Sequence, residues 1–145
     1  MEITVRPATA GDVNFCCQTH HLAYRDVVER QFGGWDESLQ DGFFAKAWDA
    51  LHFQIIESDD HPAGCFCCER QQEQILLLEI FLLPAYQGSG IGSELIRREQ
   101  CAATKLGIPI RLRVLKANQA RRLYQRLGFR ETGEDTTHFL MEWRA

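Results

Sequence analysis

Residues 76–92 read LLLEIFLLPAYQGSGIG, and this stretch decides how the chain is expected to fold. An apolar run typical of a β-strand ends at Pro84, three glycines follow at alternate positions, and residues 93–99 then repeat with a helical period. The order predicts a strand, a loop and a helix in succession. Glycine lets the backbone approach a ligand closely, and the first N–H groups of a helix have no acceptor within it. The loop is therefore expected to bind an anion, and a phosphate group fits best.

The spacing of the glycines excludes two common nucleotide-binding loops. A P-loop has Gly, four residues and then Gly-Lys-Ser/Thr, but Ser93 stands where the second glycine belongs and Glu94 where the lysine belongs. A dinucleotide-binding loop has the pattern Gly-x-Gly-x-x-Gly. Its third glycine is replaced by Ser93 when counted from Gly88, and by Leu95 when counted from Gly90. Neither pattern describes this loop.

Four helices are predicted from capping signals and from apolar periodicity. Thr9 has an aspartate three residues later, which is capping-box spacing, so the first helix is expected to begin near Ala10. Asp36 can cap the second helix and Asn118 the fourth, whereas Gly107 ends the third. The side chains expected to face the core in the first two helices are Val13, Cys16 or Cys17, His20, Ala23 or Tyr24, and Val27, followed by Leu39, Phe43, Ala47 and Trp48.

Strands are predicted where apolar residues alternate with polar ones or form short apolar runs. The predicted strands cover residues 3–6, 53–57, 63–69, 74–83, 110–115, 129–133 and 138–143. A helix between the fourth and fifth strands implies a right-handed parallel crossover there, whereas short turns join the other neighbours. We therefore expect one α/β domain, residues 1–145, with a central mixed, mostly antiparallel sheet flanked by helices.

Length, composition and charge narrow the class of protein. The chain has 145 residues, of which 45% are apolar and 25% charged, and its formal net charge is −4. These values are typical of a single soluble globular domain. The negative charge argues against nucleic acid as a partner and suits a cationic substrate. No stretch approaches the roughly 20 apolar residues of a membrane helix, so we expect a cytoplasmic protein without a membrane partner.

The cysteines favour reduced thiols in the core over other roles. The six are Cys16, Cys17, Cys65, Cys67, Cys68 and Cys101. Two adjacent pairs in apolar surroundings suit buried thiols better than a disulfide framework. Cys65 and Cys68 have the minimal spacing of a metal-binding pair, and His20 and His21 are the candidates for the remaining ligands of such a site. Because no second Cys-x-x-Cys exists and zinc usually takes four ligands, we expect no metal site.

Two motifs resemble those of one enzyme superfamily. Gln87-x-x-Gly90-x-Gly92 follows an apolar strand and a proline, and residues 118–129 read NQARRLYQRLGF. The first is similar to the pyrophosphate loop Gln/Arg-x-x-Gly-x-Gly/Ala of the GNAT acyltransferase superfamily. The second is similar to its downstream signature, in which Ala-x-x-Leu-Tyr-x-x-x-Gly-Phe follows an asparagine. The resemblance covers essentially the whole chain and implies a GNAT-like sheet of six to seven strands, about four helices and a splayed parallel strand pair.

The resemblance implies that an acyl-CoA, usually acetyl-CoA, is the co-substrate. Backbone N–H groups of the loop would bind its pyrophosphate without a lysine, helped by the helix dipole. Its pantetheine arm would lie beside the backbone at the end of the strand, where one N–H would stabilise the thioester oxygen. Two alternatives without a ligand remain open. The glycines can serve solely to form a tight turn, and Asn118 can serve solely as a helix cap. The predicted donor-binding residues are Phe81, Leu82, Leu83, Gln87, Gly88, Ser89, Gly90, Ile91, Gly92, Ser93, Asn118 and Tyr124.

Tyr124 and Glu79 are the predicted catalytic residues. By resemblance Tyr124 faces the thioester sulfur and protonates the departing thiolate, although it also fits the apolar stripe of its helix. Glu79 is the one ionisable residue within residues 76–83, where superfamily members often carry the base that accepts the amine proton. Strand alternation alone would also put a polar residue there. The residues predicted to bind the acceptor are Tyr24, Trp35, Asp36 and His138, and His138 is an alternative base.

The sequence thus predicts an N-acetyltransferase in which a primary amine attacks acetyl-CoA directly within a ternary complex. The acceptor is expected to be a small amine-bearing molecule or a peptide. The sequence leaves the oligomeric state open, although small members of the superfamily often form homodimers. Two other classes fit parts of the sequence. One is a non-catalytic acyl-CoA-binding or regulatory module that keeps the loop, and the other is a cysteine-based metal-binding protein.

Overall fold

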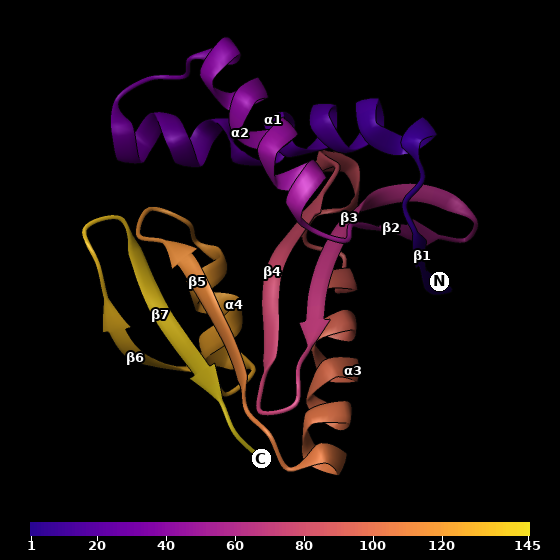
Figure 1. Ribbon diagram of the computed structural model, residues 1–145, viewed down its shortest axis with the longest axis vertical. Coiled ribbons are helices and arrows are strands. Elements are labelled where there is room, and N and C mark those ends of the chain that lie inside the picture. Colours follow the sequence, from indigo (N-terminus) through magenta and orange to yellow (C-terminus); the bar gives the residue numbers. More distant parts are fainter. The chain divides into compact units, whose positions relative to one another are not determined.

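The computed structural model describes residues 1–145 and contains seven strands and four α-helices (Figure 1). Their order is β1 (Ile3–Pro7), α1 (Val13–Phe32), α2 (Glu37–Ala50), β2 (Gln54–Ser58), β3 (His61–Arg70), β4 (Ile75–Leu82), α3 (Ile91–Leu106), β5 (Ile110–Leu115), α4 (Ala120–Arg126), β6 (Arg130–Glu134) and β7 (His138–Trp143). Every predicted helix and strand is present. None of the helices is both long and apolar enough to cross a membrane.

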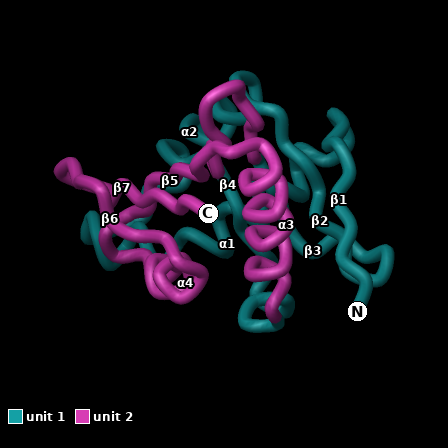
Figure 2. Tube along the Cα trace, turned by 90° about the horizontal axis from the view of Figure 1, so that it is seen from below, with its two compact units in different colours: residues 1–67, 79–89 teal, residues 68–78, 90–145 magenta.

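The chain divides into two compact units (Figure 2). The first comprises residues 1–67 and 79–89, and the second comprises residues 68–78 and 90–145. The strand order is β1-β2-β3-β4-β5-β7-β6, and both β3 and β4 contribute residues to each unit. The predicted mixed sheet flanked by helices is confirmed, whereas a single domain stays a prediction.

One strand pair is parallel, as the sequence predicted. In the first unit β1–β2 and β2–β3 are antiparallel, and in the second unit β5–β7 and β6–β7 are antiparallel. The β4–β5 pair is parallel and joins Ile75, Leu76 and Leu77 to residues 110–112, whereas β4 continues to Leu82. Helix α3 supplies the long crossover that a parallel connection requires.

The core of the first unit is built from aromatic rings and thiols. Its buried members are Cys16, Phe44, Phe53, Ile55, Cys65, Cys67 and Phe81. All six cysteines are free thiols, and Cys16, Cys65 and Cys67 are buried. The prediction of reduced core cysteines is therefore confirmed for these three. Cys17 and Cys68 are half-buried, and Cys101 is exposed.

Helix α2 packs the predicted residues Ala47 and Trp48 against this core, but not the predicted residues Leu39 and Phe43. Leu39 and Phe43 are 52% and 56% exposed, whereas Phe44 is 4% exposed. The core face runs through Phe44, Ala47, Trp48 and Leu51 at positions i, i+3, i+4 and i+7. The Phe44 ring packs on the rings of Trp48 and Phe53. A stripe through Leu39 and Phe43 and a stripe through Phe44 both have helical spacing, so spacing alone does not choose between them. The packing of Phe44 on Trp48 and Phe53 selects the stripe that contains Phe44.

Strand β3 approaches β4 closely at Gly64. A Cβ atom on Gly64 would lie 2.2 Å from the carbonyl oxygen of Phe81, far inside contact distance. The neighbouring backbone is tied by a hydrogen bond of 2.8 Å from the Leu83 N–H to the Ala63 carbonyl. Glycine is therefore required at this point of β3, because any side chain would push the strands apart.

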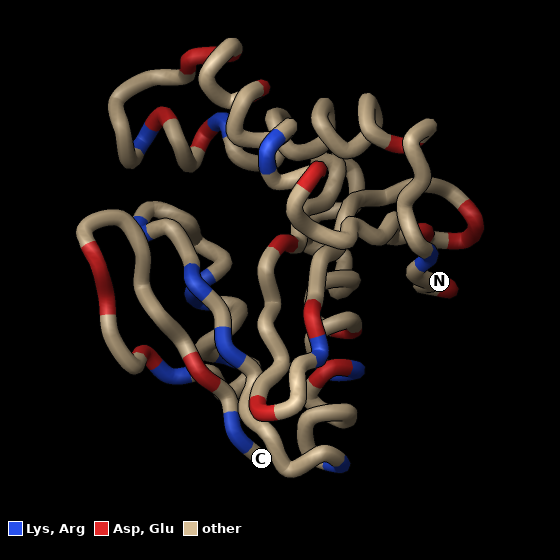
Figure 3. The backbone as a smooth tube through the Cα atoms, viewed as in Figure 1, with Lys and Arg blue, Asp and Glu red and all other residues tan.

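Strand β5 in the second unit alternates as predicted. Ile110, Leu112 and Val114 are buried, and the arginines between them are exposed. Figure 3 shows the resulting basic residues along β5. Arg111 pairs with Glu142 at 3.0 Å, and Arg113 pairs with Asp135 at 2.8 Å. These arginines therefore have acidic partners within their own unit.

Candidate functional site

The glycine loop has a backbone that only glycine adopts readily. Gly88 and Gly90 have φ angles of 72° and 89°, in the left-handed region. A Cβ atom built on either residue would meet no heavy atom within 4 Å. The space beside these two glycines is therefore open to a ligand, and a side chain would project into it. This is the shape that a backbone site for a bulky anion requires.

The polar side chains of the loop hold the loop itself. The Gln87 side-chain amide donates to the Leu82 carbonyl at 3.0 Å, and the Ser89 hydroxyl donates to the Tyr86 carbonyl at 2.5 Å. Gln87 thus connects the loop to the end of β4. Both side chains are thus engaged with backbone carbonyls of the protein itself.

The N-terminus of α3 supplies the backbone donors predicted for an anion. Gly90 is the N-cap residue, and the first hydrogen bond of the helix runs from the Glu94 N–H to the Gly90 carbonyl at 3.0 Å. The N–H groups of Ile91, Gly92 and Ser93 precede that bond and have no acceptor within the helix. The fully buried Ile91 side chain anchors this end of α3.

The backbone N–H and C=O groups at the end of β4 point alternately to the two edges of the strand. The Leu83 N–H donates to Ala63 of β3, and the Phe81 carbonyl faces Gly64 of β3, so neither group points away from that strand. Because backbone groups alternate along a strand, those of Leu82 point to the opposite edge. The backbone groups of Ile80 share this direction, and no pattern in the sequence shows which edge of the strand they face. The Phe81 side chain belongs to the core.

Glu79 lies half-buried on β4, beside Tyr24 of α1. The Tyr24 hydroxyl donates to Oε2 of Glu79 at 3.3 Å. Burial raises the pKa of Glu79 to about 7, and the hydrogen bond from Tyr24 opposes that rise. The structure therefore brings together a predicted base and a predicted acceptor residue that are far apart in the sequence. A carboxyl group with this pKa can exchange a proton near neutral pH.

Trp35 and Asp36 line a pocket at the bend between α1 and α2. The pocket has a volume of about 660 Å³ and is mostly apolar, with Val28, Phe32, Leu39 and Phe43 among its lining residues. The Asp36 carboxylate accepts from the Leu39 N–H at 3.0 Å, so Asp36 caps α2 as predicted. The Trp35 indole donates to Glu37 at 2.5 Å. Tyr24, the third predicted acceptor residue of this unit, does not line the pocket.

Tyr124 and Asn118 lie in the second unit. Tyr124 is buried on α4, and its ring packs on Phe129 at a centroid distance of 5.8 Å. The Asn118 side chain accepts from the Ala120 N–H at 2.9 Å, which makes it a cap at the start of α4. The packing role of Tyr124 and the capping role of Asn118 are thus both present, and neither excludes a role toward a ligand.

His138 stands at the start of β7, in the turn of the last hairpin. Its backbone N–H donates to Asp135 at 2.7 Å, and its ring contacts the Thr137 hydroxyl at 2.7 Å and Arg113 at 3.3 Å. Burial and the Arg113 charge lower the pKa of His138, while Asp135 opposes them. The imidazole is therefore neutral at pH 7 and able to accept a proton.

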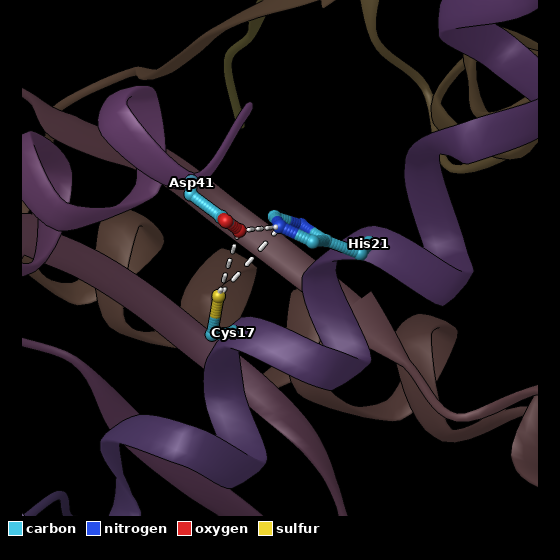
Figure 4. A group of neighbouring side chains, drawn as sticks. All are labelled: Cys17, His21 and Asp41. Atoms are coloured by element: carbon cyan, nitrogen blue, oxygen red, sulfur yellow. Dashed lines mark hydrogen bonds and ion pairs between the residues drawn. The ribbon is translucent and has the colours of Figure 1, made fainter. Parts of the chain in front are cut away.

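Helix α1 carries two histidines, His20 and His21, and His20 lies beside Tyr24. The His20 ring packs against the rings of Tyr24 and Phe81, and burial followed by the charge of His21 lowers the pKa of His20 to about 4. His21 contacts Cys17 and Asp41, and these three side chains could together hold a metal ion (Figure 4). Sequence spacing predicted no metal site and cannot connect Asp41 with Cys17 and His21, because Asp41 belongs to α2.

Known proteins resemble the chain in sequence. The sequence profile of one protein family, the acetyltransferase (GNAT) domain, matches residues 49–131, which are more than half of the chain. The ribosomal protein bS18-alanine N-acetyltransferase of Haemophilus influenzae is 32% identical over 82 residues, which are 56% of this chain and 56% of that protein. The alignment thus spans about half the length of this curated relative.

Solved structures resemble the chain in fold. The PaiA N-acetyltransferase from Thermoplasma acidophilum, in complex with coenzyme A, has a TM-score of 0.77 and 19% identity, with 100% of both chains covered. An acetyltransferase from Thermus thermophilus has a TM-score of 0.74 and 18% identity, with 100% of this chain and 98% of that chain covered. Because the identity is below 20%, these similarities establish the fold and nothing more.

Proposed function

The chain belongs to the GNAT acetyltransferase family, and from this we propose that it transfers an acetyl group from acetyl-CoA to a primary amine. The observation that carries the proposal is the loop at residues 87–93. Left-handed glycines with open space beside them lead directly into the N-terminus of a 16-residue helix. This backbone arrangement suits a pyrophosphate, the part of CoA that the family's loop motif implies.

Donor binding is proposed to rest on main-chain groups. The N–H groups of Ile91, Gly92 and Ser93 would donate to the pyrophosphate, and Gly88 and Gly90 would allow it to approach. Gln87 would act by holding the loop against Leu82. The Leu82 N–H points away from β3 and is the candidate donor for the pantetheine or thioester oxygen. Acetyl-CoA supplies the acetyl thioester, and the protein supplies its position.

Glu79 is proposed as the base that removes a proton from the amine. An amine attacks only in its neutral form, so a proton must leave it before or during transfer. A pKa of about 7 makes the ionised Glu79 carboxylate a suitable acceptor at neutral pH without making it permanently protonated. The Tyr24 hydroxyl at 3.3 Å would orient the carboxylate.

Tyr124 is proposed as the acid that protonates the departing thiolate. A phenol can donate a proton or a hydrogen bond to sulfur, and the family resemblance puts the tyrosine of the second motif in this role. Cys16, Cys65 and Cys67 are buried, and burial raises the pKa of the Cys17 thiol, so none of these four thiols is suited to a covalent relay. We therefore propose direct attack of the amine on acetyl-CoA.

The acceptor is proposed to be an amine on a small molecule or on a peptide. The pocket at Trp35 and Asp36 offers aromatic and apolar surface with one carboxylate residue, Asp36, in its lining, which suits a cationic amine with an apolar neighbour. The Haemophilus influenzae relative acts on an alanine of a ribosomal protein, so a peptide that begins with alanine is one acceptor to test.

The experiment measures thiol release from acetyl-CoA in the presence of a panel of amines. The panel contains a polyamine, free amino acids, a lysine peptide and a peptide that begins with alanine, and the same peptide with a blocked N-terminus is the control. We expect release with at least one free amine and none with its blocked counterpart. Binding of CoA measured separately, with no release from any amine, would instead support the alternative of a non-catalytic CoA-binding module. Absence of CoA binding would contradict both.

A further inference from the structure

A cluster outside the proposed transfer site brings three metal-ligating side chains together on two helices. Cys17 and His21 lie four residues apart on α1 and so share one face, and Asp41 approaches them from α2 (Figure 4). Their candidate ligand atoms all lie within 4.8 Å of one another. Cys17 and His21 are half-buried and Asp41 is exposed, so the cluster is reachable from solvent.

The two partners of His21 meet the same ring nitrogen. Nε2 of His21 lies 2.6 Å from Oδ1 of Asp41 and 3.7 Å from Sγ of Cys17. In a Cys-His-Asp catalytic triad the carboxylate and the thiol contact opposite nitrogens of the ring, so that a proton can pass through it. This cluster cannot relay a proton in that manner. Convergence of sulfur, nitrogen and oxygen on one point is instead the arrangement of ligands around a common ion.

The separations are close to those of a tetrahedral zinc site. Zinc distances of about 2.3 Å to sulfur and about 2.1 Å to nitrogen or oxygen place tetrahedral ligands about 3.6 Å apart when one is sulfur, and about 3.4 Å apart otherwise. The Cys17 sulfur lies 3.7 Å from His21 Nε2 and 3.9 Å from Asp41 Oδ1. Only the His21–Asp41 hydrogen bond of 2.6 Å has to lengthen, and Asp41 is the exposed partner.

The charges around the cluster favour a cation. A thiolate and a carboxylate together balance the charge of a divalent ion, and binding would release one proton from the Cys17 thiol to solvent. Glu37 adds a carboxylate oxygen 3.9 Å from the same His21 nitrogen. The fourth position of a tetrahedral ion can therefore be filled by Glu37 or by water.

The second nitrogen of His21 is already held. Nδ1 of His21 lies 2.9 Å from Nδ1 of His20, whose ring is packed among Tyr24, Phe44 and Phe81. Metal-binding histidines usually donate their other N–H to a fixed partner, which sets the ring orientation. Neutral imidazoles have one donor and one acceptor nitrogen, so His20 can accept from His21 when Nε2 binds a metal.

From this geometry we infer that Cys17, His21 and Asp41 form a binding site for a divalent transition metal ion with the preferences of Zn²⁺. The ion would join α1 to α2 next to the bend that carries Trp35, whose ring packs edge-on against His21 at 5.1 Å. It would therefore stabilise the helix pair beside the pocket of Trp35 and Asp36. The inference does not depend on the proposed acetyl transfer.

The test uses the full chain, purified with chelator, reduced and then freed of both reagents. Zn²⁺ is titrated in competition with a chromophoric chelator, and Co²⁺ is added separately to record its absorption spectrum. The variants are Cys17→Ser and Asp41→Asn, and the matched control is Cys101→Ser, which removes an exposed thiol from α3. Asp41 is exposed, so Asp41→Asn is expected to fold, and circular dichroism checks this for every variant.

We expect one equivalent of Zn²⁺ to bind the wild type and Cys101→Ser, and either ligand substitution to weaken binding by at least about tenfold. The Co²⁺ form should show intense tetrahedral visible bands and a thiolate charge-transfer band that is lost in Cys17→Ser. Thermal unfolding should shift upward with Zn²⁺ in the wild type and not in the two ligand variants. Absence of stoichiometric binding to the wild type, or equal binding by wild type and Asp41→Asn, would overturn the inference.

Discussion

The protonation of Glu79 is set by two opposing effects at a single residue. Burial on β4 disfavours the carboxylate, and the hydrogen bond from Tyr24 favours it, but burial dominates and the pKa reaches about 7. The alternative of an ordinary solvated residue on an open sheet face does not account for this environment. A titration near neutral pH is what the proposed base requires, and it has consequences for both activity and stability.

The activity of the wild type is expected to fall on the acid side of pH 7 through Glu79. As pH falls through the pKa of about 7, Glu79 gains a proton and can no longer accept one from the amine. Glu79→Gln should lower kcat/KM by roughly 10²-fold or more and remove this acidic limb. The measurement is kcat/KM against pH for both proteins. An unchanged profile in Glu79→Gln would exclude Glu79 as the base.

Stability gives an independent readout of the same residue. The pKa of Glu79 in the folded state lies above its ordinary value of 4.5, so this group favours folding most below pH 4.5 and loses that contribution as pH rises through about 7. Glu79→Gln lacks this loss. The difference in melting temperature, Glu79→Gln minus wild type, should therefore be larger at pH 8 than at pH 5. The corresponding change in the free energy of unfolding is at most about 3 kcal/mol.

Tyr124→Phe separates chemistry from packing at the other proposed catalytic residue. Phenylalanine keeps the ring that packs on Phe129 and removes only the hydroxyl. We expect turnover to fall by about 10²-fold with little change in the dissociation constant of CoA. Normal turnover at unchanged CoA affinity would mean that Tyr124 serves only the core of its unit.

At the scale of elements, the contact between β3 and β4 depends on the absence of a single side chain. The Phe81 carbonyl occupies the position that a Gly64 side chain would need, and the adjacent Ala63–Leu83 hydrogen bond holds the two strands at this separation. The same strand carries Glu79 and the Leu82 backbone. A side chain introduced at Gly64 would therefore displace the backbone of β4 and, with it, Glu79 and Leu82 of the proposed site.

Gly64→Ala is expected to destabilise the protein by about 1–3 kcal/mol or more, because the added methyl group displaces backbone rather than a flexible side chain. Gly42→Ala is the matched control. Gly42 lies exposed within α2, has no left-handed φ angle, and has open space around its Cβ position, so alanine should stabilise by about 0.5–1 kcal/mol. Urea unfolding measures both. Equal effects of the two substitutions would contradict the close approach.

At the scale of the whole molecule, the net charge of −4 means that an anionic cofactor receives no general electrostatic attraction. Binding of CoA therefore has to come from local donors, chiefly the loop backbone and the N-terminus of α3. A ligand that binds only the folded state raises its stability by an amount set by concentration and affinity. Thermal unfolding of the intact chain can thus report on a single loop.

CoA at about 100 times its dissociation constant should stabilise the wild type by about 2.7 kcal/mol, which corresponds to a rise in Tm of roughly 6–10 °C for a chain of this size. Gly90→Leu should abolish most of this shift, because its side chain enters the open space of the loop. Gly107→Leu has the same left-handed strain at the other end of α3 and should keep the shift. Loss of the CoA-dependent shift in both variants would mean that strain, not occlusion, is responsible.

Features that depend on neighbours along the chain can be predicted from the amino-acid sequence alone. The glycines after β4, the caps at Asp36 and Asn118, the alternation of β5 and the order of the elements all follow from residues a few positions apart. Four features emerge only from the folded chain: the buried face of α2, the requirement for Gly64, the contact of Tyr24 with Glu79, and the contact of Asp41 with Cys17 and His21. Those features depend on contacts between residues distant in sequence, and spacing rules carry no information about such contacts.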